Sequence, residues 1–356
     1  MSKVYNFSAG PCILPQEVLQ EASDSLKNFD GLDLSLIEIS HRSKNFVAVM
    51  DEATALVKEL LNVPDNYDIV FLQGGASLAF IITAYNMLSE GGKAGYVNTG
   101  TWANKAQKEA ALFGEVVELA SSKDSNYSHV PKGYEIPADL DYFHCTSNNT
   151  IFGTQMKEFP SSPVPVVCDM SSDIFSKPIN VSDFDLIYAG AQKNMGPAGA
   201  TLYIIKKDIY GKSGRKIPSY LDLKIHADKE SMFNTPPVFS TYVSMLTLRW
   251  LKANGGVEWI AGVNQAKADL LYNEIDRNPL FSGVAAKEDR SNMNATFVLN
   301  DEAHKEQFDK LWNDANISGI KGHRSVGGYR ASMYNAMDLE GVGALVNVMK
   351  ELEKSI

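Results

Sequence analysis

Two kinds of hydrophobic pattern alternate between about residues 15 and 210. Apolar residues recur at helical spacing in three segments, PQEVLQEASDSLKNF, NFVAVMDEATALVKELLN and TWANKAQKEAALF. Short β-rich runs lie among them: YDIVFLQ, KAGYVN, GEVVELA, LDYFHCT, VPVVCD, FDLIYAG and ATLYIIK. Strands that alternate with helices predict crossover units, and therefore an α/β fold with a mostly parallel sheet flanked by helices.

The pattern changes near residue 240. A helical pair at about 240–277 is followed by NATFVLN, a helix from about 301, the segment GHRSVGGYRASMYN and a last helix from about 338. A chain of 356 residues is also long for a single core. We therefore predict a large domain at 16–255, a smaller α+β C-terminal domain at 256–356, and an N-terminal segment, 1–15, that packs with the small domain.

The ends of the predicted strands carry the candidate chemistry, because ligands of such sheets bind beyond the carboxyl ends of the strands. Asp169 ends one run, and four short segments follow others: Gly74 to Ser77, Thr99 to Trp102, Ser147 to Thr150, and Gln192 with Lys193. They offer glycines, hydroxyls, an aromatic ring, a carboxylate and an amine. The sequence therefore predicts one site at this edge of the sheet.

Lys193 is the single lysine of YAGAQKNMGPAG, set among small residues between two buried runs. Burial would lower its pKa from about 10.4 toward roughly 7–8 and make the amine nucleophilic at neutral pH. Such lysines form Schiff bases with carbonyls, including the aldehyde of pyridoxal phosphate (PLP). A lone loop lysine is more often simply solvated, so this interpretation depends on its neighbours.

Those neighbours each have two interpretations. One further strand separates Asp169 from Lys193, so the two strand ends that carry them should be adjacent. A carboxylate at this position would keep a pyridine nitrogen protonated. The alternative is an aspartate that only caps a helix or stabilises a turn. The GGAS turn either presents backbone amides to an anion or uses glycine only for backbone geometry. It lacks the glycine patterns of dinucleotide-binding and P-loop sites, which disfavours both kinds of nucleotide site. Trp102 could stack on a planar ring or simply pack.

Charge narrows the class of ligand. The net charge is −10 and no run of Lys or Arg occurs, which disfavours nucleic acid and membrane surfaces as partners. Two basic clusters stand out against this background: His41 with Arg42 in SHRSK, and His323, Arg324 and Arg330 in KGHRSVGGYRAS. Arginine suits bidentate capture of carboxylate or phosphate, although surface ion pairs would use the same residues. We expect small anionic substrates.

The cysteines and the chain start exclude other classes. Cys12, Cys145 and Cys168 show no CxxC pairing, which argues against a disulfide framework or a structural zinc site, and we expect no metal. The start lacks the pattern of a signal peptide, and no apolar stretch is long enough for a membrane span. We therefore expect a cytoplasmic protein.

Eight motifs together resemble the phosphoserine aminotransferases, class-V members of the fold-type I PLP enzymes, over essentially the whole chain. They are NFSAGPCILP, SHRSKNF, FLQGGASLAF, NTGTWA, YAGAQKNMGPAG, SMFNTPP, WLKANGGV and KGHRSVGGYRASMYNAM. The resemblance implies reversible transamination of 3-phosphohydroxypyruvate with L-glutamate, which gives O-phospho-L-serine and 2-oxoglutarate in serine biosynthesis. It leaves open whether 4-phosphohydroxy-L-threonine, a substrate of pyridoxine biosynthesis, is also used.

The same resemblance implies a role for each site residue. Lys193 would hold the cofactor aldehyde and shuttle the proton, Asp169 would pair with the pyridine nitrogen, and Trp102 would stack on the ring. The further implied cofactor contacts are Ala76 and Ser77 at the phosphate, Thr150 and Gln192 as polar contacts, and Asn234 and Thr235 at the phosphate of the other subunit of a homodimer. The implied substrate contacts are His41, Arg42, His323, Arg324 and Arg330, with Arg330 as the α-carboxylate clamp. Some family members have arginine where this chain has Ser77, which leaves open the charge around the cofactor phosphate.

Two other classes of function stay open on the sequence. One keeps the cofactor and changes the reaction, as in a cysteine desulfurase or another class-V aminotransferase. A desulfurase needs a mobile catalytic cysteine, and Cys12, Cys145 and Cys168 are poorly placed for that role. The other class is a non-catalytic anion-binding or scaffold protein that retains the fold.

Overall fold

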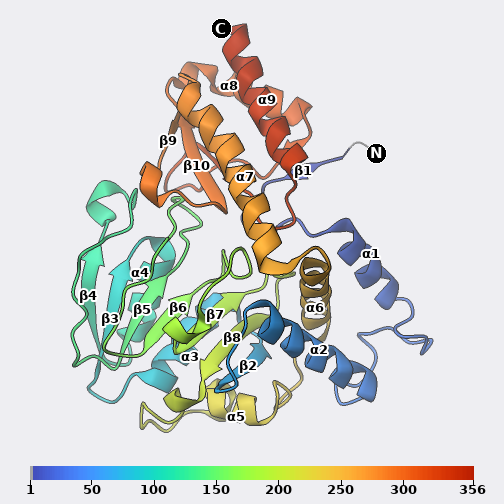
Figure 1. Cartoon of the computed structure of the whole chain (residues 1–356), viewed down its shortest axis with the longest axis vertical. Coiled ribbons are helices and arrows are strands. Elements are labelled where there is room, and N and C mark those ends of the chain that lie inside the picture. The colour runs from blue at the N-terminus through green and yellow to red at the C-terminus, as the bar shows by residue number, and fades with distance from the viewer. Residues whose placement is uncertain (1–2) are drawn as a thin grey trace.

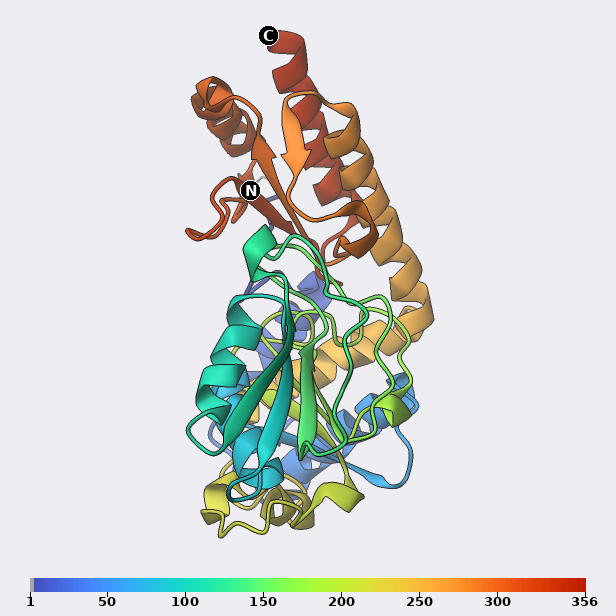
Figure 2. The same ribbon diagram turned by 90° about the vertical axis from the view of Figure 1, so that its left-hand side faces the viewer.

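The computed structural model describes residues 3–356, and Figure 1 shows two parts of unequal size. The larger part is built on one sheet with helices around it, and the smaller part contains the C-terminal end of the chain. The long helix α7 (Gly256–Arg277) begins next to the larger part and extends along the smaller part, as the view in Figure 2 also shows. Among residues 3–356, no helix combines the length and the apolar character needed to cross a membrane.

The large sheet has seven strands in the order β2-β8-β7-β6-β5-β3-β4. β8 runs antiparallel to both β2 and β7, and the remaining pairs are parallel. The predicted α/β fold with a mostly parallel sheet is therefore confirmed. The strands span Tyr67–Leu72 (β2), Lys93–Asn98 (β3), Glu115–Ser121 (β4), Tyr142–Thr146 (β5), Val166–Asp169 (β6), Leu186–Gly190 (β7) and Thr201–Lys206 (β8).

Helices cover both faces of this sheet. The central strands β5, β6 and β7 are buried along their whole length, so each face needs apolar cover. Because side chains alternate across a strand, Cys145 packs in one cluster with α2 and α6, whereas Tyr142 packs in another with α3 and α4. The helices of this part span Gln16–Ser25 (α1), Lys44–Leu60 (α2), Gly75–Met87 (α3), Thr101–Ala110 (α4), Leu223–Asp228 (α5) and Val238–Ala253 (α6).

The smaller part has its own antiparallel sheet of three strands, with β10 between β12 and β9. Its apolar cluster includes Leu271, Phe297 and Leu345, and the N-terminal Phe7 lies in the same cluster. The predicted domain boundaries after residues 15 and 255 stay predictions. The elements span Tyr5–Asn6 (β1), Phe281–Gly283 (β9), Asn294–Leu299 (β10), Lys305–Asp314 (α8), Ile317–Ser318 (β11, paired with β1), Tyr329–Ser332 (β12) and Leu339–Ser355 (α9).

Candidate active site

Lys193 lies in the loop between β7 and β8, and its side chain is buried, with 9% of the residue exposed. Its Nζ donates a hydrogen bond to Thr150 Oγ1 at 2.7 Å and lies 5.4 Å from the centre of the Trp102 ring. Thr150 belongs to the loop after β5, and Trp102 to the first turn of α4, which follows β3. Three predicted strand-end residues therefore meet at one point.

Burial changes the acidity of the Lys193 amine. Loss of water around Nζ is the largest effect and lowers the pKa of Lys193 to about 8, and the positive charge of Arg330 acts in the same direction. The negative charge of Asp169 opposes both. A buried lysine with this pKa holds a substantial neutral fraction near pH 7–8, so the amine can act as a nucleophile and as a base.

Asp169 is the last residue of β6, and 4% of it is exposed. In the sheet register it lies between Thr146 of β5 and Tyr188 of β7, so the strand ends that carry Asp169 and Lys193 are neighbours, as predicted. Burial raises the pKa of Asp169, whereas the Lys193 charge and a hydrogen bond from the Ser171 N–H, 2.9 Å from Oδ1, counteract this rise. A buried carboxylate with so few donors suits a cationic ligand group.

The loop after β5 is locked against the start of α4. Asn149 Nδ2 donates a hydrogen bond to the Thr99 carbonyl, and Gly100 packs so close that an added Cβ would collide with the Asn149 side chain. Gly100 also has φ +151°, which side chains disfavour. A glycine at this position therefore lets Trp102 and Thr150 approach Lys193 together.

A lysine that the sequence did not single out also faces this site. Lys105 Nζ lies 4.7 Å from the centre of the Trp102 ring, and its charge contributes to lowering the pKa of His323. Residues three apart lie on the same face of a helix. The spacing between Trp102 and Lys105 within a predicted helix was the signal that would have revealed it.

Arg330 brings the smaller part of the chain to the site. It lies in β12 opposite Thr296 of β10, and its Nη1 is 3.5 Å from the Thr150 carbonyl, which accepts a long hydrogen bond. Its Nε is buried and has no partner within residues 3–356. Burial lowers the pKa of Arg330. Part of this guanidinium is therefore free for an anion.

His323 joins the same positive group. Burial is the largest effect that lowers its pKa, and the charges of Arg330, Arg324 and Lys105 add to it in that order. Its Nδ1 is 2.7 Å from Ser325 Oγ. His323, Arg324 and Arg330, the second predicted basic cluster, therefore share one positive region with Lys105. An anionic substrate bound there would stabilise all of these cations.

The predicted phosphate turn starts α3. Gly74, the N-cap, has φ +103°, and Ala76 and Ser77 occupy the first turn, with Ser77 exposed. The first backbone N–H groups of a helix have no partner within the helix and attract anions. This turn follows β2. Because β8 lies between β2 and β7 and runs antiparallel to both, β2 and β7 point in the same direction. The turn therefore lies at the same edge of the sheet as the other strand ends.

Several predicted residues make no hydrogen bond or ion pair with Lys193, Asp169 or Arg330 within the described chain, among them Gln192, His41, Arg42, Asn234 and Thr235. Gln192 lies beside Lys193 in sequence and packs against Gly10 and Gly190. Arg42 is exposed, and His41 Nε2 is buried without a partner among residues 3–356. The Thr235 carbonyl accepts a hydrogen bond from Gln73 Nε2 at 3.2 Å. Their roles stay predictions.

The N-terminal segment also contacts Lys193, which the sequence did not reveal. Cys12 Sγ donates a short hydrogen bond to the Lys193 carbonyl, and a Cβ added at Gly10 would lie 3.2 Å from Lys193 Cγ. Burial raises the pKa of Cys12 to about 12, while Cys145 and Cys168 are fully buried in β5 and β6. A thiolate nucleophile is therefore absent from the described residues near Lys193, which disfavours the desulfurase alternative.

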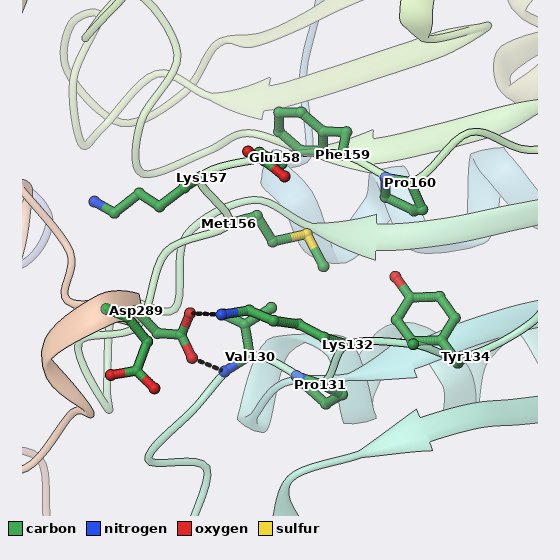
Figure 3. A pocket seen from close by; sticks show the side chains of 12 residues that line it. Val130, Pro131, Lys132, Tyr134, Met156, Lys157, Glu158, Phe159, Pro160 and Asp289 are labelled. Atoms are coloured by element: carbon green, nitrogen blue, oxygen red, sulfur yellow. Dashed lines mark hydrogen bonds and ion pairs between the residues drawn. The ribbon is translucent and has the colours of Figure 1, made fainter.

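A separate cavity of about 430 Å³ lies between residues 130–134, residues 156–160 and the short helix η5 (Lys287–Asp289). In Figure 3, Lys132 points to Asp289; Nζ and Oδ1 form an ion pair at 2.9 Å, and the Val130 N–H donates to Oδ2 at 2.9 Å. The Asp289 carboxylate is thus already satisfied, and none of the predicted site residues lines this cavity.

Comparisons with known proteins identify relatives in sequence and in fold. The sequence profile of the family described as aminotransferase class-V matches residues 4–345. The chain is 63% identical over 355 residues to a phosphoserine aminotransferase of Flavobacterium johnsoniae, which covers 99% of this chain and 100% of that protein. Its fold is similar to that of a phosphoserine aminotransferase from Bacillus circulans subsp. alkalophilus, with 42% identity, a TM-score of 0.96 and 99% of each chain covered. A PLP-bound phosphoserine aminotransferase from Trichomonas vaginalis gives 36% identity and a TM-score of 0.92, with 98% of this chain and 100% of that chain covered.

Proposed function

Because this chain belongs to the aminotransferase class-V family, we propose that it is a PLP-dependent phosphoserine aminotransferase, like its full-length relatives. It transfers the amino group of L-glutamate reversibly to 3-phosphohydroxypyruvate, which yields O-phospho-L-serine and 2-oxoglutarate for serine biosynthesis. The observation that carries this proposal is the buried Lys193 amine, held by Thr150 and Trp102 beside the Asp169 carboxylate.

The residues around Lys193 fit PLP. Lys193 would hold the aldehyde, the buried Asp169 carboxylate would hold the protonated ring nitrogen, and the Trp102 ring offers a planar surface for stacking. When bound, PLP supplies an aldehyde and a cationic ring that withdraws electrons from the substrate. The remaining proposed contacts are Ala76 and Ser77 at the start of α3 for the phosphate, with Thr150 and Gln192 as polar partners.

Lys193 would also carry the proton transfer. With a pKa lowered to about 8, its amine can take up the α-proton of the amino acid and return a proton in the second half of the reaction. The Thr150 hydroxyl, 2.7 Å from Nζ, orients the amine. Burial at 9% exposure keeps bulk water from exchanging with the proton on Nζ.

The positive group formed by Arg330, His323, Arg324 and Lys105 would bind the substrates. Arg330, with its unpartnered buried Nε, is the proposed clamp for the α-carboxylate, since a guanidinium binds a carboxylate in a bidentate manner. The other cations would meet the phosphate of phosphoserine or the distal carboxylate of glutamate. Two acids of different length need several donors rather than a single rigid one, and His41 and Arg42 are proposed to complete the set.

The proposed active form is a homodimer in which Asn234 and Thr235 reach the cofactor phosphate of the second copy. The support for a shared site is that Thr235 is exposed and that its carbonyl accepts a hydrogen bond from Gln73, the residue before the turn at Gly74. The use of 4-phosphohydroxy-L-threonine and the cytoplasmic location stay predictions.

Reduction of the PLP-loaded protein with borohydride tests the proposal. We expect the visible absorption band to disappear, and peptide mass spectrometry to find the pyridoxyl label on Lys193 and none on Lys267, the other deeply buried lysine. A colourless, unlabelled protein would contradict the enzyme assignment. A label on Lys193 in a protein that converts glutamate but not phosphoserine would assign it to another class-V aminotransferase.

A further inference from the structure

Lys267 is a fully buried lysine that the proposed reaction does not use. It lies within α7, and 0% of it is exposed. Its Nζ donates three hydrogen bonds, to the carbonyl oxygens of Met333 at 3.0 Å, Tyr334 at 2.8 Å and Met337 at 2.9 Å. An ammonium has three N–H donors and no acceptor, so every donor of Lys267 has a backbone partner.

The three carbonyls belong to one segment, residues 333–337, which we call the linking segment. It lies outside the strands and helices, between the end of β12 and the start of α9. Backbone carbonyls of such a segment need donors from elsewhere when they are buried. The Tyr334 carbonyl also accepts from the Met337 N–H at 2.9 Å, so Lys267 is a second donor there, and it is a side-chain donor from α7 to the Met333 and Met337 carbonyls.

One side of the linking segment contacts the Lys193 loop. The backbone N–H of Asn335 donates to Asn194 Oδ1 at 2.9 Å, and Asn194 directly follows Lys193. The Asn194 amide in turn donates to the Ile174 carbonyl at 2.6 Å, so the residue after Lys193 is held between the linking segment and the loop after β6.

The other side of the linking segment contacts the N-terminal segment. The Tyr334 hydroxyl donates to the Ala9 carbonyl at 2.7 Å. Ala9 precedes Gly10, which lies against Lys193 Cγ. The strand that leads into the linking segment is β12, which carries Arg330. Three routes thus lead from the linking segment to the candidate active site.

We propose that Lys267 is a positioning residue of the active site, which holds the linking segment through three carbonyls and so fixes Asn335 and Tyr334 against the two chain segments that pack on Lys193. Its relation to catalysis rests on the proposed function, whereas its effect on the position of Lys193 does not. Lys267 contacts none of the predicted cofactor or substrate residues directly. It acts through three backbone carbonyls, one for each N–H donor of its ammonium group.

Hydrogen exchange of the full-length, PLP-loaded protein tests this proposal. Lys267→Met keeps the length of the side chain and removes all three donors. We expect at least tenfold faster amide exchange in peptides that cover residues 333–337, 191–195 and 8–12, together with a displaced midpoint in the pH titration of the visible absorption band. Lys267→Gln, which keeps two N–H donors, should show a smaller effect in the same peptides.

Leu271→Ala is the matched control, because Leu271 lies one turn further along α7, is fully buried, and can donate nothing to the linking segment. It should loosen the core of the smaller part without displacing the band midpoint. If Lys267→Met does not fold, Tyr334→Phe removes the hydrogen bond to Ala9 and a longer one from Asn294 Nδ2 at 3.3 Å. It should speed exchange at 8–12 and displace the midpoint.

Faster exchange confined to residues 333–337, with an unchanged midpoint, would overturn the proposal and leave Lys267 as a purely structural residue. Because exchange is measured without turnover, this outcome is distinct from a failure of the proposed reaction. A protein that showed the exchange pattern but did not convert phosphoserine would support the positioning role and contradict the function.

Discussion

Lys193 and Lys267 are both buried in the folded chain, but their ammonium groups meet different surroundings. Burial is the largest effect that lowers the pKa in each case, and the pKa of Lys193 falls to about 8. At Lys267 three carbonyl acceptors favour the ammonium form against this effect. Lys267 has three carbonyl acceptors for three donors. Lys193 has one side-chain acceptor, Thr150 Oγ1, and otherwise lies beside an aromatic ring and a carboxylate.

The different numbers of acceptors around Lys193 and Lys267 show that burial alone does not identify a reactive lysine. A buried cation whose donors are all filled by the backbone holds the chain in place, whereas one with unfilled donors is available to a ligand. Arg330 belongs with Lys193 in this respect, because its buried Nε has no partner among residues 3–356. Both residues also hydrogen-bond to Thr150, Lys193 through Oγ1 and Arg330 through the carbonyl oxygen.

The largest effect is expected when the Lys193 amine is removed, because Lys193 is the buried lysine whose donors are free for a ligand. Lys193→Ala should leave the protein folded, since it deletes a buried charge that is costly to desolvate, yet slow the phosphoserine half-reaction by several orders of magnitude. Stopped-flow absorbance of the PLP-loaded variant measures this. Lys132→Ala, which breaks an ion pair at the separate cavity, should leave the rate unchanged. A near-normal rate in Lys193→Ala would refute the assignment.

The second prediction concerns the unfilled donors of Arg330. Arg330→Met should weaken phosphoserine binding by about 1.5–3 kcal/mol for each lost charged hydrogen bond, which corresponds to roughly 10- to 150-fold in Kd. Equilibrium titration of the visible band measures the affinity. Arg277→Met is the control, because the guanidinium of Arg277 is filled by Glu274 and Glu353. Equal affinity in the wild type and Arg330→Met would show that Arg330 is not the clamp.

The smallest expected effect is on pH dependence. In the chain freed of PLP, the rate of Lys193 labelling by an aldehyde with a reducing agent should rise about tenfold per pH unit below pH 8 and level off above it. The sign follows from the lowered pKa of about 8, because the reactive neutral amine dominates above the pKa. Free lysine, with its ordinary pKa near 10.4, should keep rising to above pH 10. A Lys193 profile that also rises to pH 10 would contradict an amine made acidic by burial.

Much of the fold was accessible from local sequence patterns. The seven β-rich runs correspond to β2 through β8, because an apolar run between turn residues records the burial of a central strand. The strand order was not accessible. β8 lies between β2 and β7 and runs antiparallel to both, and this arrangement depends on contacts between runs that are far apart in the chain.

The candidate active site also has features that the sequence predicts and features that it does not. The position of Lys193, Asp169, Thr150 and Trp102 at the ends of predicted strands places them at one edge of the sheet from the sequence alone. These strand-end positions do not reveal Lys105, the contact of Cys12 with the Lys193 carbonyl, or the three carbonyls around Lys267. The Cys12 and Lys267 contacts join parts of the chain that are far apart in sequence. Helical spacing places Lys267 on the same face of α7 as the buried Ile260 and Leu271, but it does not reveal the three acceptors.

Local sequence patterns thus predict which elements form and which end of the sheet carries the chemistry, since both depend on residues close in the chain. Whether each buried cation is free to bind a ligand depends on the tertiary fold. Whether an ammonium is free for a ligand depends on how many acceptors surround it, and those acceptors come from other strands, loops and helices that the fold brings within hydrogen-bonding distance.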